Sequence, residues 1–101
     1  MIHVLASIQI QPGKRQAFLD AFHAIVPTVL QEEGCVQYTP TVDVDINLAA
    51  QQLDENIVTI VEKWESVSAL QAHLVAPHME AYRETVKDLV VSASLKVLED
   101  A

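Results

Sequence analysis

The sequence contains few of the residues that hold together disulfide-bonded or zinc-bound folds. Cys35 is its only cysteine, so no intrachain disulfide and no cluster of several zinc-bound thiolates can form within one chain. The small neighbours of Cys35 and the absence of a nearby base indicate a buried thiol, not a nucleophile. No apolar run approaches the ~18 residues of a membrane-spanning helix, and the alternating N-terminus does not match a signal peptide. We therefore expect a cytoplasmic protein without a membrane partner.

Basic and aromatic residues are also scarce. Six lysines and arginines accompany 14 acidic residues, which gives a formal net charge of −8, and no stretch gathers the basic side chains. This charge argues against nucleic acid and anionic lipid as partners. Aromatic residues make up 5% of the chain while hydrophobic residues make up 50%, so the core should be mainly aliphatic. The length of 101 residues predicts one domain, residues 1–101.

Alternation of apolar and polar side chains predicts the strands. It marks four segments: residues 2–10, 35–44, 56–65 and 92–98. Pro40 indicates that the second of these lies at a sheet edge or contains a bulge. The connection over residues 45–55 is longer than a hairpin needs, so it should hold a helical turn or act as a flap.

Apolar side chains at helical spacing predict three helices: residues 15–32, 67–76 and 77 to about 91. Pro27 should kink or shorten the first helix, and Gly34 is a natural stop after it. Ser66 is placed to cap the second helix, and Pro77 suits the first turn of the third.

The order strand, helix, strand, strand, helix pair, strand is typical of an α+β, ferredoxin-like split βαβ fold. It forms a four-stranded antiparallel sheet with its helices on one face. We assign five side chains to the other, uncovered face: His3, Leu5, Val58, Ile60 and Trp64. Because these cannot all be exposed to water without a cost in free energy, we expect a homodimer in which a second sheet packs against this one.

Titratable and aromatic side chains gather between residues 56 and 78. Alternation places Glu62 and Trp64 on one face of the third strand, while His73 lies inside a helical pattern and His78 follows Pro77. These residues have structural interpretations as well as functional ones. His73 can tie helix to sheet, His78 can cap or pack a helix, and Trp64 can belong to the core.

A metal site would need imidazole and carboxylate ligands, which Glu62, His73 and His78 offer. The two histidines are five residues apart across a proline break, not at the four-residue spacing that aligns two ligands on one helix face. We therefore predict no metal ligand set here.

Three stretches carry a family resemblance: MIHVLASIQIQPGKRQAFLDAF, the EEGCVQY junction and, most specifically, VEKWESVSALQAHLVAPHMEAY. Over nearly the whole chain the sequence resembles the antibiotic biosynthesis monooxygenase family. The resemblance implies a dimeric α+β barrel with a substrate pocket between sheet and helices, and oxidation of a quinol or other phenolic aromatic by O₂ with no flavin, haem or metal. The haem-degrading branch carries tryptophan about where His73 stands and its haem-ligating histidine about where Arg83 stands, so haem degradation is not expected.

Cofactor-free oxygenation of this kind needs a base, because a dihydroxy-aromatic can reduce O₂ once it is deprotonated. We assign His73 as the base, since imidazole titrates near neutral pH, and Glu62 as the carboxylate that orients it. The remaining candidates for contact with the substrate are Tyr38 and Trp64 as aromatic walls, with Tyr82, Arg83 and His78. Two other functions stay open: a non-catalytic dimeric module that binds a small apolar ligand, and an isomerase acting on a small oxygenated metabolite.

Overall fold

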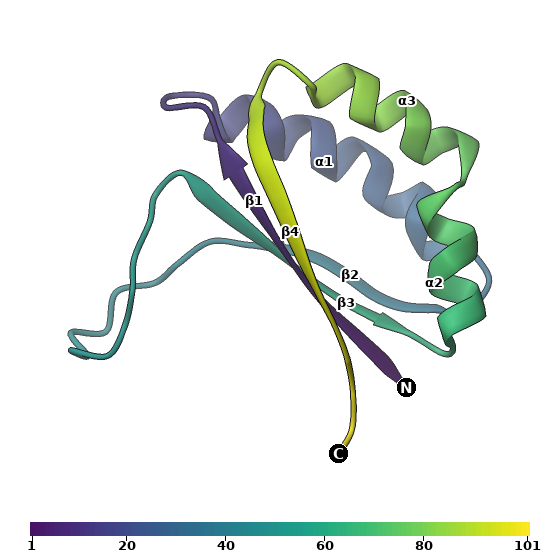
Figure 1. Cartoon of the computed structure of the whole chain (residues 1–101). Coiled ribbons are helices and arrows are strands. Elements are labelled where there is room, and N and C mark those ends of the chain that lie inside the picture. The colour runs from purple at the N-terminus through teal and green to yellow at the C-terminus, as the bar shows by residue number, and fades with distance from the viewer.

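A computed structural model describes residues 1–101 and shows one antiparallel four-stranded sheet in the order β2-β3-β1-β4 (Figure 1). The elements in chain order are β1 (Ile2–Ile10), α1 (Arg15–Leu30), β2 (Cys35–Thr41), β3 (Ile57–Trp64), α2 (Val67–Leu74), α3 (Pro77–Val86) and β4 (Val90–Glu99). All three helices lie on one side of the sheet (Figure 1). The predicted ferredoxin-like α+β fold is confirmed, and the edge position of β2 agrees with Pro40.

Local signals in the sequence place the start of α2 and the turn that follows α1. The Ser66 hydroxyl oxygen accepts the Ala69 backbone N–H at 3.1 Å and caps α2, as predicted. α1 continues through Pro27 to Leu30, and the chain then reverses at Gly34, where φ is +81°. A side chain at Gly34 would place its Cβ 2.6 Å from the Cβ of Ala69, so glycine is required here both for its backbone angle and for the close approach of α2.

The predicted ends of α3 and β2 differ most from the structure. α3 ends at Val86, not near residue 91, because Leu89 turns back to donate its N–H to the Val86 carbonyl at 2.9 Å and Val90 pairs with Ile10 in the sheet. The apolar run around Leu89 fits either a helix or a strand, and pairing with β1 decides between them. β2 ends at Thr41, and the segment that follows projects away from the sheet without strand pairing (Figure 1).

Burial on β3 alternates strictly along the strand. The side chains that point toward the helices are all buried: Val58, Ile60, Glu62 and Trp64. Phe18 and Phe22 of α1 pack onto this side of the sheet, with the Phe22 ring stacked 5.0 Å from that of Tyr38 on β2. The covered side of the sheet therefore forms the core and also holds a carboxylate.

The predicted composition of the uncovered face is wrong for three of its five residues. Val58, Ile60 and Trp64 lie on the covered face, because the register pairs them with even-numbered residues of β1. Directly paired residues share a face, and His3 and Leu5 are odd-numbered, so they lie on the opposite face. Of the five, only these two remain outside the core.

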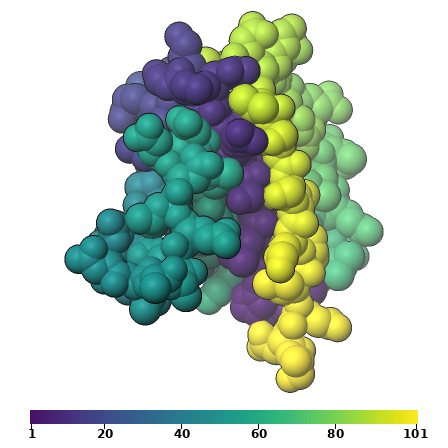
Figure 2. Space-filling view, turned by 60° about the vertical axis from the view of Figure 1, so that its left-hand side comes forward, coloured from purple at the N-terminus to yellow at the C-terminus, as the bar shows by residue number.

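Strand β4 is an edge strand whose side chains are exposed along most of its length. Figure 2 shows it beside β1 on a face that no helix covers. Its four large exposed hydrophobic side chains, 42–53% accessible, are Val91, Leu95, Val97 and Leu98. None of the three helices has the length and the apolar character that a membrane span requires.

Candidate active site

A cavity of about 470 Å³ lies between the sheet and the helices, with a mostly apolar lining. Its volume is in the range of pockets that bind small molecules. Both sides of the fold contribute to its wall, from Ala6 on β1 and Ile60 on β3 to Met79 on α3. Five of the seven predicted site residues line it: Tyr38, Glu62, His73, Tyr82 and Arg83.

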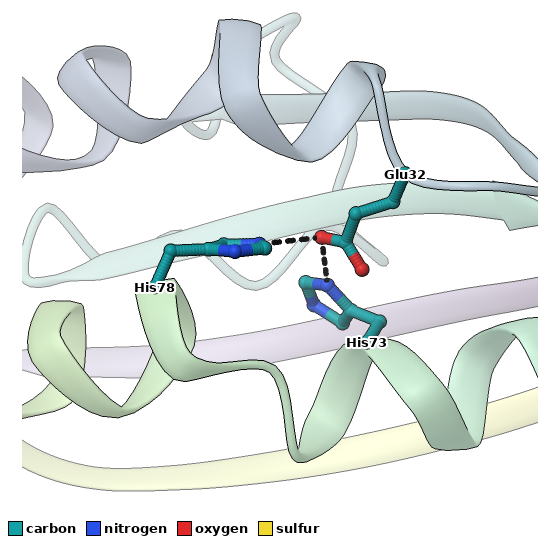
Figure 3. A group of neighbouring side chains, drawn as sticks. All are labelled: Glu32, His73 and His78. Carbon is teal, nitrogen blue, oxygen red and sulfur yellow. Dashed lines mark hydrogen bonds and ion pairs between the residues drawn. The ribbon is translucent and has the colours of Figure 1, made fainter.

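His73 lies in the last turn of α2, and its hydrogen-bond partner is Glu32, in the turn that follows α1. One carboxylate oxygen of Glu32, Oε2, lies 2.8 Å from Nδ1 of His73 and 2.8 Å from Nε2 of His78 (Figure 3). Since a carboxylate oxygen only accepts, each of these ring nitrogens carries its hydrogen. The predicted pairing of His73 with Glu62 is not found, because Glu62 is held by another side chain.

The second ring nitrogen of His73, Nε2, is free to meet a ligand. Every buried side-chain nitrogen or oxygen atom of the chain has a hydrogen-bond partner, whereas Nε2 of His73 has none, so this atom cannot be fully buried. Nε2 is therefore accessible, and His73 lines the cavity. With the hydrogen on Nδ1, a neutral His73 presents the lone pair of Nε2 as an acceptor. Burial lowers the pKa of His73, partly offset by Glu32, and so favours this neutral ring.

Trp64 lies behind the cavity wall and does not line it. Its side chain is 0% exposed, and its indole ring lies 4.7 Å from the His73 ring, centroid to centroid. The indole N–H donates to Oε1 of Glu62 at 2.9 Å. These two residues are two apart on one strand face, which brings their side chains together. Trp64 therefore packs against the His73 ring and holds Glu62 in place.

Glu62 presents its other carboxylate oxygen to the cavity. Oε2 has no partner in the chain, and by the same reasoning as for His73 it is accessible from the cavity that Glu62 lines. Burial raises the pKa of this carboxyl to about 7, although the Trp64 hydrogen bond opposes the shift. Glu62 can therefore hold or release a proton near neutral pH.

Two tyrosines and one arginine add hydrogen-bond donors. The Tyr38 ring meets that of His73 edge to face at 5.3 Å, and neither Tyr38 nor Tyr82 uses its hydroxyl within the chain. Burial raises the pKa of both phenols, so both remain O–H donors at neutral pH. Arg83 donates from Nη2 to the Leu74 carbonyl at 2.7 Å, which ties α3 to the end of α2.

Glu32 is the functional candidate that the sequence prediction missed. One signal was present, since Glu32 and Glu33 follow the C-terminal end of a helix, where the helix dipole disfavours carboxylates unless they are paired. His78 lies outside the cavity, on the other side of Glu32. The break at Pro77 does not separate the two histidines. It turns α3 so that both rings reach the same oxygen (Figure 3).

Comparisons of the sequence and of the structure with known proteins agree with one another. The sequence pattern of a family described as antibiotic biosynthesis monooxygenase matches residues 1–85. An Escherichia coli K12 protein named "Probable quinol monooxygenase YgiN" is 45% identical, over 98% of this chain and 97% of the relative. YcnE of Bacillus subtilis is 31% identical over 97% of this chain and 94% of its own length. A conserved protein of Methanosarcina mazei has the same fold, with a TM-score of 0.84 at 21% identity over 99% of this chain and 92% of that one.

Proposed function

The chain belongs to the antibiotic biosynthesis monooxygenase family, and from this premise we propose that it oxidises a quinol or a related phenolic aromatic with O₂, without an organic cofactor or metal. The observation that carries the proposal is the position of the two ring nitrogens of His73. Its Nδ1 is fixed by Glu32 and its Nε2 is open to an apolar cavity large enough for an aromatic ring. The quinol substrate class is taken from the name of the E. coli relative.

His73 acts as the general base in this proposal. Its Nε2 accepts a proton from a substrate hydroxyl, and Glu32 stabilises the imidazolium that forms, at Nδ1. The tilted contact with Trp64 and the edge contact with Tyr38 keep the ring in one orientation. The mostly apolar wall limits water around the resulting phenolate.

The overall reaction balances without an external reductant. The quinolate gives electrons to O₂, and one oxygen atom becomes bonded to a ring carbon, which loses its hydrogen as a proton. The O–O bond breaks, and the other oxygen atom takes up two protons and leaves as water. The quinol ring supplies all the electrons for both atoms and ends as a hydroxyquinone. The base takes the hydroxyl proton at the start and returns it to the leaving oxygen.

Glu62 and the two tyrosines complete the site. In this proposal Tyr38 and Tyr82, which line the cavity, donate hydrogen bonds from their hydroxyls to substrate oxygens, and Arg83 contributes positive charge to the same wall. Glu62 provides a second group that exchanges protons near neutral pH. Developing negative charge on the substrate or on reduced oxygen is thus met by donors that are already in position.

The working form in this proposal is a homodimer. On its outer side the cavity is bounded by Ala93 and Leu95 of edge strand β4, and Leu95 is 53% exposed. Leu5 and Leu98 add apolar surface on the open face of the sheet. A second subunit packed on β4 would cover this surface and shield the cavity from water.

Oxygen uptake by the metal-free, untagged protein with a panel of quinols tests the proposed reaction. Wild type should consume O₂ above the rate of autoxidation in buffer. His73→Ala should lower kcat about 100-fold or more, because it removes the base. His73→Gln fills more of the space of the imidazole than His73→Ala does, so it tests the loss of the base with less risk of a folding defect. His23→Ala, on the exposed side of α1, is the matched control.

Two results would contradict the proposal. The first is O₂ uptake that the His73 variants leave unchanged although they remain folded. The second is conversion of substrate without O₂ consumption, which would point to an isomerase.

A further inference from the structure

We propose that Glu32, His73 and His78 form a binding site for a divalent first-row transition metal ion, of which Zn²⁺ is the best fit. Binding at this site does not depend on the proposed oxygenase activity. The donor set, two imidazoles and one carboxylate, is one that zinc accepts with a remaining position open to water. His73 lies in α2, His78 in α3 and Glu32 in the turn after α1, so the fold brings the carboxylate to the two rings.

The geometry of the cluster is that of ligands converging on one point. Nδ1 of His73 and Nε2 of His78 both lie 2.8 Å from the same oxygen of Glu32, and all three donor atoms lie within 4.8 Å of one another (Figure 3). For metal bonds of about 2.0–2.1 Å, neighbouring ligands lie about 3.0–3.4 Å apart. Adjustments of about 1 Å in the side chains would therefore bring them to coordinating distance.

Burial and charge also suit a cation. His73 is buried and held by Trp64, while Glu32 and His78 have side chains that are 14% and 30% exposed. One ligand is therefore fixed, and the other two leave a path for the ion and for bound water. The chain carries a net charge of −8, which favours cations at its surface. Arg83, which lies near His73, opposes this attraction in part.

Metal binding has a consequence for the proposed base. An ion on Nδ1 of His73 requires the ring to carry its hydrogen on Nε2, the atom that faces the cavity. The same ring then donates at Nε2 and cannot accept a proton there. Zinc should therefore inhibit turnover, and this consequence, unlike the binding, rests on the proposed function.

Titration calorimetry with ZnCl₂, and visible absorption with CoCl₂, measure the binding directly on the untagged full-length protein after treatment with chelator. We expect one ion per chain and a Co²⁺ spectrum typical of nitrogen and oxygen ligands. Glu32→Gln and His78→Ala should each weaken binding by about tenfold or more, since each removes one of three ligands. His78 is partly exposed, so its replacement should leave the fold intact, which circular dichroism can check.

Other histidines provide the controls. His23→Ala and His3→Ala should leave the affinity unchanged, because His23 is exposed on α1 and His3 pairs with Asp100 at the far end of the chain. Absence of saturable binding in wild type would overturn the proposal. So would binding that survives both Glu32→Gln and His78→Ala, or that is lost in either control. Loss of oxygenase activity alone would not affect it, since binding is measured without substrate.

Discussion

Replacing Glu62 with glutamine should change how the stability of the fold depends on pH. Glu62 is 6% exposed, and burial raises the pKa of its carboxyl from 4.5 to about 7. The folded protein thus holds this proton more tightly than the unfolded chain. Its contribution to stability is full below about pH 4.5 and is lost as the pH rises to about 7. At about 1.4 kcal/mol for each pKa unit, the difference corresponds to about 3 kcal/mol.

Glutamine at this position removes the charge and keeps the contact. Its amide oxygen can accept the Trp64 indole N–H in place of Oε1, and its amide nitrogen faces the cavity. We therefore expect Glu62→Gln to match wild type at about pH 4.5 and to exceed it at pH 7.5 by about 3 kcal/mol in the free energy of unfolding. The titration of His73 contributes equally to both proteins and cancels in the difference.

Urea unfolding followed by circular dichroism at several pH values, at one protein concentration, measures this difference. Glu55→Gln is the matched control, because it makes the same chemical change at an exposed carboxylate, and Arg15 bonds only to the backbone carbonyl of this residue. Its curve should run parallel to that of wild type. If the Glu62→Gln curve were also parallel to wild type from pH 4.5 to 7.5, the carboxyl of Glu62 would not be desolvated as inferred. Its assignment as a proton-exchanging group of the site would then fail.

Two further predictions concern the fold and the assembly. Gly34→Ala should lower the free energy of unfolding by about 2–4 kcal/mol, because it places a side chain at φ +81° and against Ala69. Gly13→Ala should lower it by only about 1 kcal/mol, because Gly13 has a similar φ of +79° but open space around it. Equal losses in the two variants would show that α2 yields to the added methyl group. Light scattering at micromolar concentration should give twice the 11.1 kDa mass of one chain, and a mass of one chain would contradict the dimer.

Structural features could be predicted from the sequence where neighbouring residues alone determine them. Alternation over β3 predicted its bounds to within one residue. It also predicted the shared face of Glu62 and Trp64, because side chains two apart on a strand point the same way. Ser66 marked the start of α2 and Gly34 the turn before β2 by their own chemistry. Such features depend on a few neighbouring residues, so they can be deduced without knowledge of the fold.

Features that depend on distant residues were not predictable in this way. Glu32 and His73 are 41 positions apart, and only the packing of α1 beside α3, which follows α2 directly, brings the carboxylate to the ring. The assignment of Val58 and Ile60 to the open face failed for a related reason. Alternation separates the two faces of a strand but does not say which one the helices cover.

The position of Trp64 gives the chain an internal optical probe. It is the only tryptophan, it is fully buried, and it touches both the imidazole of His73 and the carboxyl of Glu62. Indole emission is sensitive to protonated imidazole and to nearby polar groups, so intrinsic fluorescence from this chain reports on one location. Proton uptake, ligand entry into the cavity and metal binding at Glu32, His73 and His78 would each change the same fluorescence signal, without any label attached to the protein.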